Sequence, residues 1–311
     1  MTEEFEDTAL INKYRPQSLD DFLGTDALKS SIASVLERET NRPHAIMFHG
    51  PAGCGKTTLA YLVAKMWSCS ERDFRELNIA DFTGVDTVRK IRHSAQYPPL
   101  GGGGVKIWLL DEAHRFSPAA QDGLLKLLEK PPRYVFFILC TTNPKKLLGT
   151  IRSRCTPFKV NTLQRSKIIK LLKHIIEQEK IADFPVAAYK EIARVSQGSP
   201  RTAIAILDSV IDVTDDALLM EAIAEAYGDE TSVKELADAL INKVSDWSKL
   251  SPLLRNVSDP EQMRRSLLGY FTAVLLNKRS DRLAYLIAVF CDPMYELGNL
   301  VAAVYSVCVE E

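Results

Sequence analysis

The sequence predicts a chain whose first half is an α/β domain with a parallel sheet and whose second half is helical. In the first half, short and almost continuously apolar segments alternate with helical segments, as expected for strands buried on both faces of a parallel sheet. A glycine-rich phosphate-binding pattern lies between one of these strands and the next helix. After Cys155, strand-like segments become rare and helical periodicity continues to the end.

The composition is that of a soluble globular protein with more than one domain. Apolar residues make up 46% of the 311 positions and charged residues 25%, which supports a packed core. The acidic N-terminus and the absence of an uncharged stretch of about 20 residues predict neither a targeting peptide nor a membrane helix. The six cysteines form no CxxC pair, so we expect no zinc module, no disulfide framework and a cytoplasmic location.

The elements of the first half follow from this alternation. Strands are expected at Ala45–His49, Phe74–Ile79, Val105–Leu110 and Tyr134–Cys140. The helical segments between them are Thr57–Trp67, Val85–Ala95 and Pro118–Glu129.

The second half is expected to contain helices at Ser166–Lys180, Val186–Ser196 and Pro200–Val213. Gly198 can end one helix, Ser199 can cap the next, and Pro200 fits the first helical position. A boundary is expected near Gly228. The sequence therefore predicts three domains, at residues 1–160, 161–228 and 229–311.

Residues 50–57, with the sequence GPAGCGKT, fit the phosphate-binding pattern G-x-x-x-x-G-K-[ST]. They lie between the strand AIMFH and the helix TLAYLVAKMW. This context supports a phosphate-binding loop over a glycine-rich turn with a chance lysine. Backbone N–H groups and the helix N-terminus would bind phosphate oxygens. Lys56 would reach the β- and γ-phosphates, and the hydroxyl of Thr57 would bind Mg²⁺. The expected cofactors are ATP and Mg²⁺, and the expected loop contacts are Gly50, Gly53, Cys54, Gly55, Lys56, Thr57 and Thr58.

An acidic pair follows the apolar strand IWLL and completes this expected site. Asp111 and Glu112 would emerge at the carboxyl edge of the sheet, where ligands of open α/β sheets bind. We expect Asp111 to hold Mg²⁺ and Glu112 to orient and deprotonate the attacking water. The letters DEAH also name a helicase box, but the helical second half leaves no room for a second helicase domain. His114 is expected to be a surface or hydrogen-bonding residue rather than a metal ligand, because no second ligand is nearby.

Residues 81–132 and 136–155 resemble the clamp-loader branch of AAA+ ATPases, which includes bacterial gamma/tau, the small subunits of replication factor C and phage clamp-loader subunits. The likeness covers roughly residues 10–210, and its most specific part is Ser153-Arg154-Cys155. It implies a RecA-like AAA+ domain, a helical lid and a helical collar that oligomerises. The four-cysteine zinc module of bacterial gamma/tau is missing, so no zinc is expected.

The resemblance also implies roles for individual residues. Tyr14, Arg15 and Pro16 are similar to the segment that lies against the adenine. Thr142 aligns with the sensor-1 position, with Asn143 as the alternative, and Arg201 resembles sensor 2. Arg154 resembles the arginine finger that reaches into the neighbouring subunit's site, although it could instead bind DNA phosphates.

The function implied by the resemblance is that of the ATPase subunit of a sliding-clamp loader. ATP binding would open the clamp, and hydrolysis would release it on primer–template DNA. The implied partners are the sliding clamp, the phosphate backbone of primer–template DNA, and other loader subunits in a pentameric assembly. The alternatives are another AAA+ DNA motor, such as a branch-migration helicase or a helicase loader, and a scaffold subunit without turnover.

Contacts with DNA and clamp are expected at particular segments. DNA contacts are expected from Arg89, Lys90 and Arg92 in Thr83–Ala95, with Gly101–Gly104 and Arg115 as further candidates, although this helix face could simply be solvated. For the clamp, Met66, Trp67 and Ser68–Phe74 are the candidates, with Trp67 favoured as a core residue. Gln121 would couple the ATP site to DNA or a neighbour, or would be a surface glutamine.

Overall fold

The computed structural model describes residues 9–38, 40–80, 83–101, 104–243, 246–255, 257, 259–277 and 279–309. The chain divides into two compact units that interleave along the sequence. The first unit comprises Met1–Phe184 and Ser196–Ser209, and the second comprises Pro185–Val195 and Val210–Glu311. The expected division at residues 160 and 228 stays a prediction, and position 228 lies inside one continuous helix, α10 (Asp216–Ile241).

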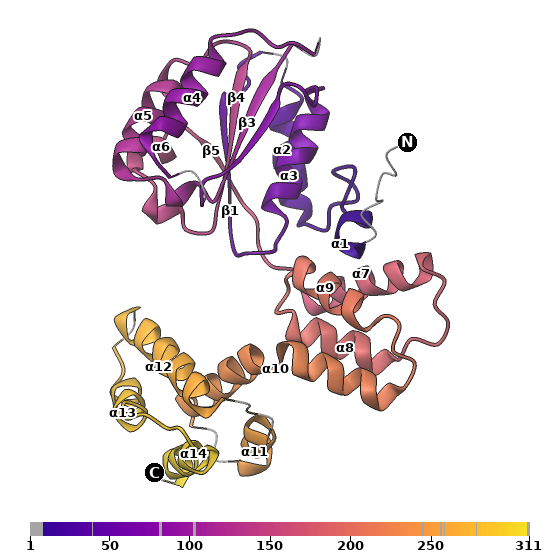
Figure 1. Ribbon diagram of the computed structural model, residues 1–311, viewed down its shortest axis with the longest axis vertical. Coiled ribbons are helices and arrows are strands. Elements are labelled where there is room, and N and C mark those ends of the chain that lie inside the picture. The colour runs from indigo at the N-terminus through magenta and orange to yellow at the C-terminus, as the bar shows by residue number, and fades with distance from the viewer. Residues whose placement is uncertain are drawn as a thin grey trace. The chain divides into compact units, whose positions relative to one another are not determined.

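The first unit is built on a five-stranded sheet in the order β2-β3-β4-β1-β5, with every pairing parallel (Figure 1). The strands are β1 (Ala45–His49), β2 (Phe74–Asn78), β3 (Lys106–Asp111), β4 (Val135–Thr141) and β5 (Thr156–Lys159). The first four coincide with the expected strands to within a residue at each end, and β5 is an additional short edge strand beside β1.

Both faces of the sheet are covered by helices, which explains why its strands are apolar at successive positions. Along β3, Ile107 and Leu109 belong to the core on one face, whereas Trp108 and Leu110 belong to the core on the other. The first face is covered by α2 (Asp26–Leu36) and α3 (Lys56–Met66). The second is covered by α4 (Val85–Ala95), α5 (Pro118–Glu129) and α6 (Gly149–Arg152) (Figure 1).

Further helices complete the first unit near the carboxyl ends of the strands. They are α1 (Leu10–Lys13), α7 (Arg165–Gln178) and α9 (Pro200–Val210), together with the short 3₁₀ turns η1 (Ala113–Arg115) and η2 (Pro144–Lys146). The start of α9 follows its expected signals. Gly198 has φ +80°, a left-handed conformation that favours glycine, and the Ser199 hydroxyl accepts a hydrogen bond from the Thr202 N–H.

The second unit is helical. It contains α8 (Val186–Val195), α10, α11 (Trp247–Arg255), α12 (Pro260–Asn277), α13 (Asp281–Val289) and α14 (Leu297–Val309). Fully buried Phe271 and Phe290 pack together in its core with ring centroids 5.9 Å apart. The described part of the chain has no helix with the length and apolar character needed to cross a bilayer.

Candidate functional site

The phosphate-binding loop, residues 50–57, has a backbone that requires its glycines. Gly55, which precedes α3, has φ +96°, and a Cβ there would lie 2.7 Å from the ring of Phe22. A Cβ on Gly50 would lie 1.9 Å from the carbonyl oxygen of Val160. Because L side chains would meet strain or collision at these positions, only glycine permits this tight turn against β5 and the N-terminal segment.

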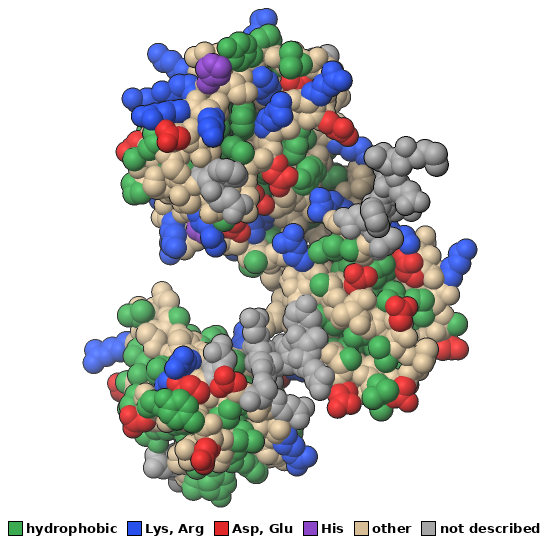
Figure 2. Space-filling view, viewed as in Figure 1, with side chains coloured by type: hydrophobic (Ala, Val, Ile, Leu, Met, Phe, Trp, Pro, Cys, Tyr) green, Lys and Arg blue, Asp and Glu red, His purple; other side chains and the backbone are tan. Residues whose placement is uncertain are grey.

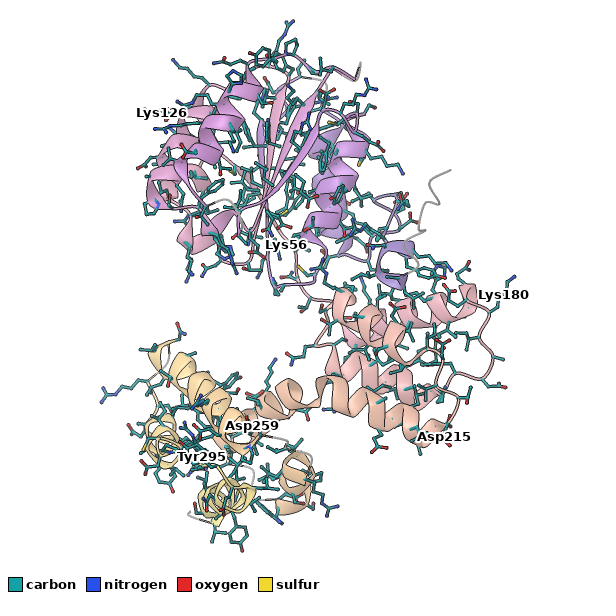
Figure 3. The ribbon with its side chains drawn as sticks, in the orientation of Figure 1. Lys56, Lys126, Lys180, Asp215, Asp259 and Tyr295 are labelled. Carbon is teal, nitrogen blue, oxygen red and sulfur yellow. The ribbon has the colours of Figure 1, made fainter. Side chains whose placement is uncertain are left out.

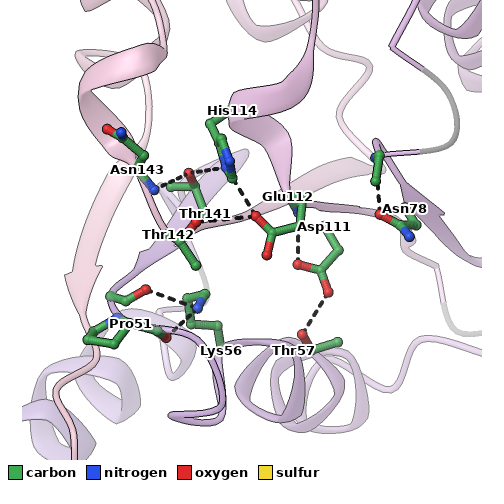
Figure 4. A network of polar contacts seen from close by, with 12 residues as sticks. Pro51, Lys56, Thr57, Asn78, Asp111, Glu112, His114, Thr141, Thr142 and Asn143 are labelled. Carbon is green, nitrogen blue, oxygen red and sulfur yellow. Dashed lines mark hydrogen bonds and ion pairs between the residues drawn. The ribbon is translucent and has the colours of Figure 1, made fainter. Parts of the chain in front are cut away.

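Lys56 lies at the end of the sheet where α3 begins (Figure 3), and only 6% of it is exposed. Its Nζ donates hydrogen bonds to the carbonyl oxygens of Gly50 at 3.0 Å and Pro51 at 2.6 Å (Figure 4). The N-cap of α3 is Gly55, which has no side chain to accept the N–H groups of the first turn. These N–H groups and the ammonium make the loop a site for an anion such as phosphate.

Thr57 and Asp111, the two expected metal ligands, are in direct contact. The Thr57 hydroxyl donates to Oδ2 of Asp111 at 2.8 Å, and the other oxygen of Asp111 accepts a hydrogen bond from the Glu112 N–H (Figure 4). One side chain comes from the start of α3 and the other from the end of β3. A hydroxyl and a carboxylate are hard oxygen ligands, so this pair fits Mg²⁺ bound together with a phosphate.

Glu112 lies beside this pair in an uncommon backbone conformation for a residue with a side chain, with φ +51° and ψ +39°. Its Oε2 accepts a hydrogen bond from the Thr142 hydroxyl at 3.4 Å and lies 3.1 Å from Nδ1 of His114 (Figure 4). Burial lowers the pKa of His114, the Glu112 carboxylate opposes that shift, and nearby cations such as Lys146 reinforce it. His114 is therefore a hydrogen-bonding residue of this site.

Of the two alternatives for sensor 1, the structure brings Thr142 and not Asn143 to Glu112. Asn143 is exposed, its side chain points away from Glu112, and its backbone N–H donates to the Thr141 hydroxyl at 3.1 Å (Figure 4). Both residues follow β4, which lies between β3 and β1 in the sheet. The position of Thr142 therefore suits a contact with the reacting end of a bound nucleotide.

A cavity of about 620 Å³ extends from the phosphate-binding loop to the N-terminal segment, α7 and α9, all within the first unit. Predicted residues that line it are Tyr14, Arg15, Pro16, Gly53, Cys54, Gly55, Lys56, Thr57, Thr58, Asp111, Glu112 and Arg201. The Arg201 N–H lies 3.4 Å from the Gly53 carbonyl oxygen, which fixes the first turn of α9 beside the loop. Gly50, Thr142, Asn143 and Arg154 are not among the lining residues.

Several lining residues were missed in the sequence. They include Phe22, Tyr61, Glu76, Lys170, His174 and Ile204. Helical spacing could have found some of them, because Tyr61 lies four residues after Thr57, and Lys170 and His174 are four residues apart on the polar face of α7. Tyr61 and Glu76, which both line the cavity, form a hydrogen bond with each other. No local sequence pattern predicts this contact.

The wall formed by the N-terminal segment is fixed to α7. The Tyr14 hydroxyl donates to Oε1 of Glu179 at 2.6 Å, and Nζ of Lys13 lies 2.8 Å from the same oxygen. Burial, then the hydrogen bond to Glu179, raises the pKa of Tyr14 to about 12. The ring of Tyr14 also meets His174 edge-on, with centroids 6.5 Å apart. An aromatic wall of this kind suits a planar base.

Arg154 lies away from the cavity of its own chain. Its guanidinium forms an ion pair with Glu129 at 2.7 Å and a hydrogen bond with the Thr150 carbonyl, and 35% of the side chain remains exposed. Neighbouring Cys155 is buried, and burial raises the pKa of its thiol to about 12, so it is a core residue and not a nucleophile.

The expected clamp and DNA segments differ in exposure. Trp67 is a core residue at 4% exposure, with its ring tilted against that of Phe136, whereas Met66 is 44% exposed. Arg89, Lys90 and Arg92 are exposed on α4, and Figure 2 shows Lys and Arg side chains over the face where Figure 1 places α4 and α5. The segment Gly101–Gly104 lies partly outside the described residues.

Gln121 is buried at 4% exposure and is therefore not a surface glutamine. Its Nε2 donates to the carbonyl oxygens of Phe116 and Lys146, and its Oε1 accepts from the Leu148 N–H. The side chain thus connects α5 with the segment between Thr142 and Arg154.

Two family models match parts of the chain. The model described as DNA polymerase III, delta subunit, matches residues 73–164, and the model described as Holliday junction DNA helicase RuvB P-loop domain matches residues 14–91. Similar curated proteins include DNA polymerase III subunit tau of Bacillus subtilis, 30% identical over 88% of this chain and 53% of the relative. The tau subunit of Escherichia coli is 32% identical over 75% of this chain and 39% of the relative.

The chain thus spans about half or less of the length of these tau relatives. Among solved structures, RuvB of Thermotoga maritima superposes with a TM-score of 0.58 at 23% identity, covering 71% of this chain and 78% of RuvB. At this identity the likeness concerns the fold alone. It is the fold of a P-loop domain followed by helices, as the sequence predicts.

Proposed function

We propose that this AAA+ protein, a relative of the tau subunits of DNA polymerase III, is the ATPase subunit of a sliding-clamp loader. The observation that carries the proposal is that the expected catalytic residues do not all lie in the same cavity. Lys56, the Thr57–Asp111 pair and Glu112 line one cavity, whereas Arg154 does not line it, as we would expect of a residue that acts on a neighbouring site.

The fold and the family resemblance support this reading. The P-loop AAA+ fold is confirmed by the five-stranded parallel sheet and by the likeness to RuvB. The resemblance to the clamp-loader branch is confirmed by the DNA polymerase III delta model and by the tau relatives. Because the chain spans only part of the tau relatives, its activity and partners are inferred here from its own residues.

The chemistry we assign is hydrolysis of the β–γ phosphoric anhydride of ATP. The triphosphate would lie along the loop and the N-terminus of α3, with Lys56 at its β- and γ-phosphates. Mg²⁺, held by Thr57 and Asp111, would neutralise charge on the phosphates. Glu112 would accept the proton of the attacking water, with Thr142 beside it, and Tyr14, Arg15 and Pro16 would bind the base.

Arg154 would complete the site of a neighbouring subunit, and the proposed assembly is pentameric. An arginine supplied in trans stabilises charge in the transition state and raises the rate by about 10³–10⁵ in other NTPases. Its ion pair with exposed Glu129 is weak enough to exchange for a phosphate, because surface pairs contribute only about 0–1 kcal/mol. Hydrolysis would then depend on assembly.

The proposed partners are a sliding clamp and primer–template DNA. Exposed Arg89, Lys90 and Arg92 on α4 would bind phosphates without reading sequence. Met66, exposed at the end of α3, is the better candidate for a clamp contact because Trp67 is buried. Since the relatives are bacterial replication proteins by name, we place the protein in the cytoplasm of a bacterium or a phage-infected host.

A branch-migration motor is the second candidate, favoured by the RuvB model over residues 14–91. The deciding experiment measures ATP hydrolysis with and without a sliding clamp and primer–template DNA. Strong stimulation by clamp and DNA together supports clamp loading. Stimulation by DNA alone, accompanied by strand separation or junction movement, would instead support a branch-migration motor.

A further inference from the structure

The proposed function gives roles to Asp111 and Glu112 of the sequence DEAH but none to His114, although His114 lies beside Glu112. It belongs to η1, directly after Glu112, and its side chain is only 12% exposed. We propose that His114 is a positioning residue, which holds one oxygen of the Glu112 carboxylate so that the other oxygen faces the reacting water. This inference rests on the proposed ATPase function of the same site.

The two oxygens of Glu112 have different surroundings. Oε2 contacts both the Thr142 hydroxyl, at 3.4 Å, and Nδ1 of His114, at 3.1 Å. Among the described residues, Oε1 has no hydrogen bond, and Figure 4 shows it pointing toward the side where Lys56 and Thr57 lie. The carboxylate is therefore held through one oxygen and presents the other to the cavity, as a general base requires.

The contacts of the imidazole define which nitrogen carries the proton. An ionised carboxylate can only accept a hydrogen bond, so the 3.1 Å approach of Nδ1 to Oε2 of Glu112 is favourable only when Nδ1 carries the proton. The same nitrogen lies 3.1 Å from the Thr141 hydroxyl, whose oxygen also accepts from the Asn143 N–H. With Nδ1 protonated, its hydrogen bond goes to the Thr141 hydroxyl, and the same N–H edge of the ring lies 3.1 Å from Oε2 of Glu112. Thr141 is fully buried at the end of β4. The ring is thereby fixed against the sheet.

Such a support is needed because the backbone of Glu112 is not in a relaxed conformation. With φ +51° and ψ +39°, a residue with a side chain persists only where its surroundings hold it. Loss of the contact with His114 would leave the Glu112 carboxylate free to adopt other rotamers. A displacement of about 1 Å of a catalytic group can cost about 100-fold in rate.

Three substitutions in this chain test the role of His114 through ATP hydrolysis, measured in the same assembly as clamp loading. In His114→Asn, the side-chain amide can replace the Nδ1 donor, whereas His114→Gln moves the donor outward and His114→Ala removes it. We expect roughly 10- to 100-fold lower kcat for the Ala and Gln variants, with KM for ATP within about twofold, and near wild-type kcat for Asn. Wild-type kcat in His114→Ala, or equal loss in Asn and Ala, would overturn the proposal.

A second measurement does not depend on hydrolysis. Imidazole ¹⁵N spectra of the five histidines, with the His114 signals identified by their loss in His114→Asn, report the tautomer. We expect the Nδ1–H form and a change of its signals in Glu112→Ala. An Nε2–H tautomer would overturn the positioning role. If the wild-type assembly hydrolyses no ATP, the proposed function fails, and these spectra still decide whether His114 holds Glu112.

Discussion

The hydroxyl of Tyr14 donates a 2.6 Å hydrogen bond to Glu179, a residue 165 positions later in the chain. Tyr14 lines the cavity, and Glu179 ends α7, which lines it from another side. This contact joins two walls of the proposed nucleotide site.

This contact predicts a change of stability at alkaline pH. The pKa of Tyr14 is raised from 10.0 to about 12 in the folded protein, so the folded state retains this proton more strongly. The stabilisation is complete below pH 10 and is lost as the pH rises from about 10 to about 12. Burial chiefly raises the pKa of Tyr61 to about 12 as well, so ultraviolet titration of tyrosinate should show more than one late-titrating tyrosine. One of these late transitions should disappear in Tyr14→Phe and move to lower pH in Glu179→Ala. An unchanged titration in Glu179→Ala would refute the contact.

Arg154→Ala is expected to abolish ATP hydrolysis in the assembly and leave nucleotide binding by the single chain almost unchanged. The reason is that Arg154 lies outside its own cavity and contacts Glu129 instead. A loss of about 10³-fold or more in kcat is expected. Turnover and binding of a fluorescent ATP analogue would be measured in parallel. Arg152→Ala is the matched control, because Arg152 is an exposed arginine two residues earlier, at the end of α6. Lost binding in Arg154→Ala would count against action in trans.

Gly50→Ala should destabilise the first unit and weaken ATP binding. The new Cβ would lie 1.9 Å from a backbone oxygen of Val160, so the loop or β5 must move. The expected cost is about 1–3 kcal/mol in the free energy of unfolding. Gly269→Ala is the control with the opposite expected sign. Gly269 lies within α12, and no atom lies within 4 Å of the position a Cβ would take. The substitution should therefore raise the free energy of unfolding by about 0.5–1 kcal/mol. Denaturant unfolding measures both, and equal effects would contradict the geometry.

Trp67 and Met66 are adjacent in sequence and should behave differently. Trp67→Ala empties a buried site beside Phe136 and should lower the free energy of unfolding by about 3–5 kcal/mol. Met66→Ala should change it by less than about 0.5 kcal/mol. Thermal unfolding measures the first effect, and binding of the Met66 variant to the clamp measures whether this exposed side chain belongs to an interface. Similar stability losses in both variants would contradict the burial.

The fold was predictable where local pattern and tertiary environment agree. Strand β1 and helices α4 and α5 have the expected bounds, because apolar runs, caps and helical spacing all mark them. Strand β5 was missed: its four residues, Thr156–Lys159, include Pro157 and carry little apolar pattern, and the strand exists because β1 offers a free edge.

The placement of the loop, Asp111 and Glu112 in one cavity was predictable, because the loop and the acidic pair each follow a buried strand of the parallel sheet. Phe22, Glu76 and Glu179 were not, since each reaches the site from a distant segment. Phe22 lies beside the loop because Gly55 has no side chain to exclude it. Such contacts depend on how segments fold together and leave no local pattern.

The interleaving of the two units has a practical consequence for dissecting the protein. Arg201 belongs to the first unit only because the chain returns there for Ser196–Ser209, after contributing α8 to the second. A fragment that stops at Phe184 lacks α9 and one side of the cavity. A fragment that stops at Ser209 keeps α8 but deprives it of α10, the helix against which it packs. No single cut therefore yields both an intact ATPase piece and an intact remainder, and truncation experiments need an internal deletion of Pro185–Val195 with a designed linker.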